Sequence, residues 1–154
     1  MSDWLRNIFL RPESATPPTV IRRFHTTDPT LSTDSVVVEG DSWLIDAKES
    51  QVVLLFEVAD PDAEKCMLTY RATMKSDGLE GKAYLEMWCR FPGRGEFFSK
   101  GLNQALKGST RWSSYEIPFR LRKGERPDLI KLNLVVEGRG KIWIRDVELL
   151  KMHR

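Results

Sequence analysis

From residue 19 onward, short runs of β-branched and aromatic residues recur at near-regular intervals, and turn-forming residues separate them. The runs are VIRRFH, SVVVEG, SWLIDA, QVVLLFEV, CMLTYRATM, KAYLEMWCRF, WSSYEIPFRL, IKLNLVVEG and KIWIRDVELL. The separators include DPTLSTD, DPDAEK, SDGLEG, RKGERPD and GRG. About eight or nine short strands with this spacing predict an all-β, antiparallel sandwich or barrel. Only GLNQALKG, residues 101–108, has the composition of a helical turn.

Alternation within these runs predicts which side chains face the core. In KAYLEMWCRF the odd positions are all apolar, whereas the even positions form a charged strip with two aromatic rings. CMLTYRATMK and IKLNLVVEG alternate in the same way. The predicted outward residues of the three runs include Tyr84, Glu86, Trp88, Arg90, Arg71, Lys131, Asn133 and Glu137. In WSSYEIPFRL, Pro118 suits an edge strand or a bulge.

The N-terminal residues follow a different pattern. Trp4, Leu5, Ile8 and Phe9 have helical spacing, and Pro12 would end the helix. We therefore divide the chain into residues 1–18, an amphipathic helix with a Pro-containing connector, and residues 19–154, the β-domain. The apolar stripe of the helix is expected to pack on its own domain or on a protein partner. Only two arginines and one aspartate accompany it, so membrane attraction would be weak.

Length and composition set further bounds. A chain of 154 residues fits one domain, and a formal net charge of +2 gives no strong field toward nucleic acid or membrane. No apolar run is long enough to span a bilayer, and no signal-peptide pattern is present, so the chain is expected to be soluble and cytoplasmic, or secreted if a leader was removed. Cys66 and Cys89 are expected to be reduced and buried, with a cross-strand bridge as the alternative.

The last third of the chain resembles a known superfamily. Its order is W-x-x-Y-x-I-P-F-x-L (112–121), K-G-x-x-P (123–127), LIKLNLVVEG (129–138) and G-x-G-x-x-W-I-x-D-V-x-L (138–149). This order resembles the final strands of jelly-roll domains in the galactose-binding-like and carbohydrate-binding-module superfamily. The resemblance implies a jelly-roll β-sandwich, in which Gly138 and Gly140 would form a tight turn into the closing strand.

The resemblance also implies a class of ligand. Members typically bind glycans through aromatic residues on a concave sheet face or in loops at one end, and many hold a structural calcium ion near the terminal strands. Here Arg145 precedes Asp146 where related domains often have two acidic residues. Calcium needs several oxygen ligands, so a cation at this position disfavours it. We therefore expect no cofactor, with a structural calcium ion as the disfavoured alternative.

Signatures of catalysis are weak. The two histidines, His25 and His153, lie near no nucleophile motif, and no phosphate-binding loop or zinc motif is present. Glu86 and Glu116 face outward, and if their strands are neighbours the two carboxylates are placed like the acid and base of a glycoside hydrolase. Opposite charges on every strand favour the alternative that both carboxylates form cross-strand ion pairs. We therefore expect a protein that is not an enzyme, with a small glycoside hydrolase as a distant alternative.

The outward strip suggests a saccharide platform. An aromatic ring can stack on a pyranose while carboxylate, guanidinium and amide groups bind its hydroxyls. The predicted ligand-binding residues are Trp88, Tyr84, Glu86, Arg90, Arg71, Lys131 and Asn133, with Trp88 first among them. In the alternatives these rings only pack under a loop or the N-terminal helix, or the face serves a protein-interaction module. A second candidate is the loop of residues 91–101, where Phe97 and Phe98 are adjacent.

Overall fold

The computed structural model describes residues 17–153, and the regular structure there is almost entirely β-strand. The strands are β1 (Thr19–Phe24), β2 (Val36–Glu39), β3 (Ser42–Ala47), β4 (Gln51–Ala59), β5 (Cys66–Phe91), β6 (Gly95–Lys100), β7 (Leu106–Arg120) and β8 (Leu129–His153). A single 3-10 turn, η1 (Leu102–Gln104), lies between β6 and β7 within the described residues. The predicted N-terminal helix, whose apolar stripe is Trp4, Leu5, Ile8 and Phe9, falls within residues 1–16 and so lies outside the described part, together with its expected docking role.

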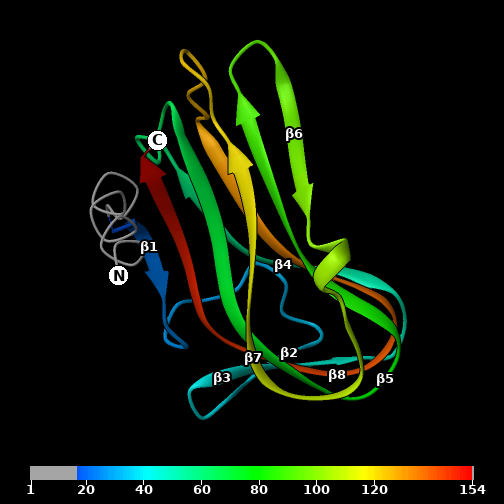
Figure 1. The fold of residues 1–154 in the computed structure, drawn as a ribbon. Coiled ribbons are helices and arrows are strands. Elements are labelled where there is room, and N and C mark those ends of the chain that lie inside the picture. Colours follow the sequence, from blue (N-terminus) through cyan, green and yellow to red (C-terminus); the bar gives the residue numbers. More distant parts are fainter. Residues whose placement is uncertain (1–16, 154) are drawn as a thin grey trace, which may run out of the picture.

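Two very long strands organise the sheet. β5 and β8 pair with each other antiparallel along most of their lengths, and every other strand except β2 pairs directly with one of them. Figure 1 shows the two strands running down together, turning at the lower right and returning upward. The turn divides the sheet into two halves that fold onto each other as a sandwich.

Each half has its own set of strands. The first half-sheet contains residues 66–77 of β5 and 139–153 of β8, flanked by β7 on one side and by β1, β3 and β2 on the other. The second half-sheet contains residues 80–91 of β5 and 129–138 of β8, flanked by β6 and β4. The edge position of β7 explains how it accommodates Pro118, as predicted.

Glycines permit the shared corner. Gly81 and Gly138 are paired across β5 and β8, and both have positive φ angles, +94° and +131°. A Cβ atom on Gly138 would overlap the carbonyl oxygen of Glu80, and one on Gly81 would overlap that of Glu137. The sequence-based expectation of separate turns at SDGLEG and at GRG is therefore wrong, because each long strand passes through the corner without reversing to pair with itself.

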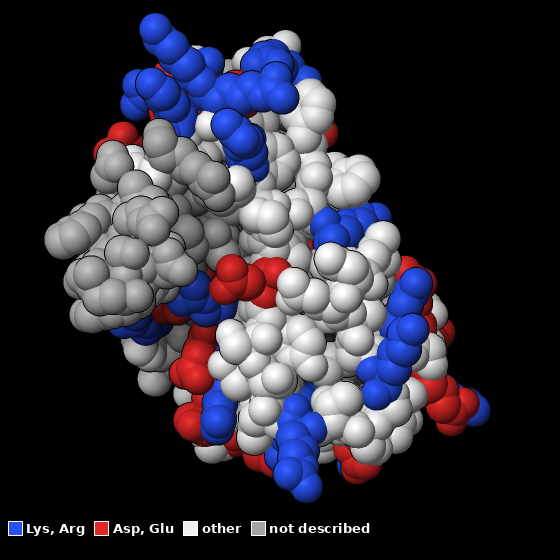
Figure 2. Space-filling model, in the orientation of Figure 1, with Lys and Arg blue, Asp and Glu red and all other residues white. Residues whose placement is uncertain are grey.

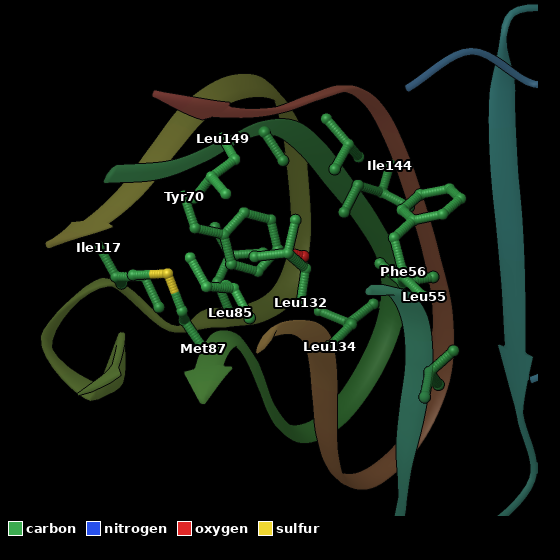
Figure 3. Close-up of a cluster of buried hydrophobic side chains, with 14 of the residues drawn as sticks. Leu55, Phe56, Tyr70, Leu85, Met87, Ile117, Leu132, Leu134, Ile144 and Leu149 are labelled. Atoms are coloured by element: carbon green, nitrogen blue, oxygen red, sulfur yellow. The ribbon is translucent and has the colours of Figure 1, made fainter. Parts of the chain in front are cut away.

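The core lies between the two half-sheets. Leu68 and Tyr70 of the first half pack with Leu85, Met87 and Leu132 of the second, and all five are at most 2% exposed. Figure 3 shows four of them, Tyr70, Leu85, Met87 and Leu132, converging on one another. The Tyr70 hydroxyl donates to the backbone carbonyl of Asn133 at 3.2 Å, so this buried phenol has a partner. Each fully buried large apolar side chain contributes about 1.5–3 kcal/mol, which makes this core the main source of stability.

The all-β prediction and the predicted faces are confirmed. Alternate residues of β5, from Cys66 to Met74 and from Ala83 to Phe91, are buried as expected. Cys66 and Cys89 are both buried and free. One segment was predicted wrongly: residues 95–100, expected to be part of a loop, form β6 and pair with β5.

Candidate functional site

The outer face of the second half-sheet gathers most of the residues that the sequence singled out. Successive side chains of a strand point to opposite sides, so the register of β4, β5, β6 and β8 fixes the members of this face. We call it the polar face; it consists of Val52, Leu54, Glu57, Tyr84, Glu86, Trp88, Arg90, Glu96, Phe98, Lys100, Lys131, Asn133, Val135 and Glu137.

A buried polar pair occupies the centre of the polar face. Glu86 and Asn133 face each other across β5 and β8, and are only 5% and 4% exposed. The Asn133 Nδ2 donates to Glu86 Oε1 at 3.0 Å, and the ammonium group of Lys100 lies 3.7 Å from Glu86 Oε2. A carboxylate buried to this degree costs free energy unless donors surround it. Asn133 and Lys100 supply that compensation and fix the orientation of the carboxylate.

Tyr84 lies beside this pair and is also closed to solvent. Its ring is 3% exposed, and its hydroxyl donates to Glu137 Oε2 at 2.6 Å. Burial, with the hydrogen bond to Glu137 and the nearby carboxylates, raises the pKa of Tyr84 to about 12. The expectation that the Tyr84 ring forms part of an open platform is therefore wrong, because its apolar surface is already packed.

The accessible aromatic surface lies at the β5–β6 side of the face. Trp88 is half-buried and pairs in register with Phe98, which is 55% exposed. Their ring centroids are 5.1 Å apart with an interplanar angle of 57°, and Lys100 Nζ lies 4.8 Å from the Phe98 centroid. Trp88 and Phe98 thus form an inclined aromatic pair, with a cation that links it to Glu86.

Arg90 and Lys131, two further cations of the face, are ion-paired. Arg90 donates through two nitrogens to Asp128, at 2.9 and 3.3 Å. These hydrogen bonds lower the pKa of Asp128 and raise that of Arg90. Lys131 Nζ lies 2.9 Å from Glu96 Oε2. Arg90 is thus occupied, whereas Lys131 keeps two further N–H donors for other acceptors.

Two residues of the predicted constellation lie elsewhere. Arg71 is on the outer face of the first half-sheet, where it contacts Glu116 at 3.1 Å and Glu148 at 3.5 Å. Glu116 pairs in register with Arg71, so it is not a neighbour of Glu86. The prediction that Arg71 joins the strip is wrong, and the supposed acid and base of a hydrolase stand on opposite half-sheets. The cross-strand ion-pair alternative is confirmed for Glu116.

The remaining tryptophans of the described chain also have clear places. Trp43 is 1% exposed in the core. Trp143, on the outer face of the first half-sheet, is half-buried and donates to Glu39 at 3.2 Å. Arg145, where calcium binding was considered, stacks on Trp112 at 4.0 Å. Across residues 17–153, no group of three or more His, Cys, Asp and Glu is placed to hold a metal ion.

Phe98 and Lys100 are the site residues that the sequence reasoning left off the strip. Their strand was obscured by Pro92, Gly93 and Gly95, which favour a loop. The period-two order of Glu96, Phe98 and Lys100 is the sequence signal that could have identified this strand and placed the three residues on one face. Within the described residues, no helix has the length and apolarity needed to cross a bilayer.

Comparison with known proteins gives matches in structure but not in sequence. No family model matches the chain, and no curated protein matches it. The CBM22-1–GH10 modules of the Clostridium thermocellum endo-1,4-β-D-xylanase 10B, solved with xylohexaose, align with a TM-score of 0.57 at 10% identity; the alignment covers 86% of this chain but only 29% of that one.

Two smaller proteins align over most of both chains. A family 29 carbohydrate-binding module gives a TM-score of 0.54 at 17% identity, with 89% of each chain covered. A family 4 module gives 0.50 at 10% identity, with 79% of this chain and 77% of the other covered. At such low identities the likeness establishes the fold alone, a β-sandwich, as the C-terminal motifs implied.

Proposed function

We propose that this protein is a non-catalytic carbohydrate-binding module that binds a saccharide on its polar face. The observation that carries the proposal is the arrangement of Trp88 and Phe98 beside the buried Glu86–Asn133 pair. The fold shared with carbohydrate-binding modules supports it, including one solved with xylohexaose.

The geometry suits a polyhydroxylated ligand. The inclined pair of Trp88 and Phe98 offers apolar ring surface for the C–H face of a pyranose. Lys100 and Lys131 lie next to the rings and offer N–H donors for sugar hydroxyls. Glu86 is nearly closed to solvent, so its role is to hold Lys100 in place beside the Phe98 ring, where the ammonium group can meet a sugar hydroxyl without reorganising.

The same geometry argues against hydrolysis. Hydrolysis of a glycoside by the common mechanism needs two carboxyl groups on either side of one bond. On the polar face Glu137 accepts the Tyr84 hydroxyl and Glu96 pairs with Lys131, so neither is poised opposite Glu86 as a free acid. Glu57 stands on β4, and β8 lies between it and the strand of Glu86. We therefore assign the face to binding.

The test is a glycan-array screen followed by calorimetry on wild type and Trp88→Ala. Trp143→Ala is the matched control, because it removes a half-buried indole from the outer face of the other half-sheet. Circular dichroism must first show that all three proteins are folded. We expect saccharide binding by wild type and by Trp143→Ala, and a loss of at least about tenfold in affinity for Trp88→Ala, because stacking on one ring is worth about 0.5–1.5 kcal/mol beyond the area it buries.

Two results would contradict the proposal. Failure of folded wild type to bind any glycan would exclude saccharide recognition, and a pull-down for a protein partner would then be the next experiment. Saccharide binding that is lost in Trp143→Ala but kept in Trp88→Ala would place the site on the first half-sheet.

A further inference from the structure

A hollow lies at the end of the sandwich, next to the polar face. It has a volume of about 280 Å³, and aromatic rings line much of it. Phe91 packs against Phe97 at 5.8 Å and against Phe119 at 6.1 Å between ring centroids. Phe97 is 47% exposed, so part of this apolar lining is open to solvent.

The hollow is also positively charged. Arg94, Arg120 and Arg122 line it, against a single carboxylate, that of Glu125. Glu125 is already engaged, because it lies 3.8 Å from Arg94 and accepts the backbone N–H of Arg122 at 2.7 Å. Within residues 17–153, neither the Arg120 nor the Arg122 guanidinium forms an ion pair with a carboxylate.

The surroundings reinforce the charge. A second hollow shares Arg120 and Arg122 and adds Lys65 and Lys123. Figure 2 shows lysine and arginine side chains gathered at this end of the molecule, where the loop between β7 and β8 lies in Figure 1. The chain as a whole has a formal net charge of only +2, so this concentration of cations is local.

Phe98 connects the hollow to the polar face. It lines the hollow and also stacks beside Trp88. A ligand chain that lies on Trp88 and Phe98 would therefore continue toward Arg120 and Arg122 without leaving the surface. A neutral saccharide gains little from two guanidinium groups without carboxylate partners, whereas a carboxylate on the sugar forms the paired N–H bonds that guanidinium favours.

From this continuity we infer that the ligand is an acidic saccharide, whose carboxylate groups bind Arg120 and Arg122 in the end hollow. The inference rests on the proposed saccharide function and specifies its ligand class. The aromatic rings hold the sugar, and the arginines select for its charge.

The test compares acidic polymers with their own carboxyl-reduced forms, so that only the charge differs. Polygalacturonate, alginate and glucuronoxylan serve as probes in calorimetry or affinity electrophoresis. We expect at least one acidic polymer to bind about tenfold more tightly than its reduced form, in line with two partly exposed charge contacts. That preference should weaken as the salt concentration rises from about 0.05 to 0.5 M.

A double variant assigns the preference to the hollow. Arg120→Gln/Arg122→Gln should bind the acidic polymer only as tightly as its reduced form. The control is Lys48→Gln/Arg139→Gln, which removes the same charge from two exposed residues at the glycine corner. We expect this control to keep the preference.

Each other outcome overturns a defined statement. Binding of neutral and acidic forms with equal affinity refutes the acidic ligand but leaves saccharide binding standing. An equal loss in both double variants shows that net charge, and not the hollow, attracts the polymer. No binding of any polymer, acidic or reduced, removes this inference together with the proposed function.

Discussion

Replacing Asn133 by leucine should measure how strongly the buried Glu86 carboxylate depends on its amide donor. Leucine has a similar size but no N–H, so Glu86 would stay 5% exposed and lose its 3.0 Å hydrogen bond. A hydrogen bond to a charged group contributes about 1.5–3 kcal/mol to the free energy of unfolding, and the protein loses this whole contribution when a buried acceptor is left without its donor. We expect Asn133→Leu to lower the free energy of unfolding by about 2–3 kcal/mol, measured by urea denaturation with circular dichroism.

The double-mutant cycle isolates the pair. Glu86→Leu alone should cost about 1–2 kcal/mol, because the Asn133 amide loses its acceptor. The double variant Glu86→Leu/Asn133→Leu should be more stable than Asn133→Leu, because it leaves no buried carboxylate without its amide donor, and Lys100, which loses its partner, is partly exposed to solvent. We expect a coupling free energy of about 1–3 kcal/mol between the two residues. If the stability losses of the two single variants sum to that of the double variant within about 0.5 kcal/mol, the claim that the pair acts as a unit is refuted.

Three further predictions concern the corner, the phenol and the thiols. Gly138→Ala should prevent folding or lower the free energy of unfolding by more than about 4 kcal/mol, because its Cβ would overlap the neighbouring strand. Gly78 also has a positive φ angle but has open space around it, so Gly78→Ala should lower the free energy of unfolding by only about 1–2 kcal/mol. Similar losses for the two variants in urea denaturation would show that the strands do not cross closely. The pKa of Tyr84 is raised to about 12 in the folded protein, so the stability it contributes is complete below about pH 10 and is lost as pH rises from 10 to 12. Between pH 10 and 12 the free energy of unfolding should therefore fall more for wild type than for Tyr84→Phe. An equal fall for both proteins would contradict the raised pKa of Tyr84. Burial raises the pKa of the Cys89 thiol to about 12, and that of Cys66 is also raised, so neither should react with a thiol reagent at pH 8 until the chain is unfolded; rapid reaction of the folded protein would show that these thiols are accessible.

Local alternation was enough to predict the residues that β5 and β8 contribute to the polar face. Glu86 and Trp88 are two residues apart on one strand, so their shared face follows from the pleat alone. Asn133 and Lys131 alternate in the same way on β8, and the antiparallel register of β5 and β8 brings the two sets together. Alternation could not predict how exposed each side chain of the face is. The burial of Tyr84, for example, depends on side chains from neighbouring strands.

Apart from β6, which forms a local hairpin with β5, the wrong placements concern contacts between distant parts of the chain. Arg71 obeys the same alternation as Trp88, but it precedes the corner in β5 and so belongs to the other half-sheet. Gly81 and Gly138 each look like part of a turn within their own segment. Only the close approach of the two strands shows that they form one shared corner. The hollow between Phe97 and Arg122 was likewise invisible, because its lining comes from β5, β6, β7 and the loop after β7.

The most direct test of the saccharide proposal is an NMR titration that follows the indole N–H signals. The chain has five tryptophans, and their indole signals can be assigned by single substitution. With a saccharide identified on the array, we expect the Trp88 signal to shift in a saturable way, while the signals of Trp43 in the core and Trp143 on the opposite face stay in place. Shifts at Trp143 without a shift at Trp88, or no shift at Trp88 with any saccharide, would contradict the assignment of the polar face as the binding site.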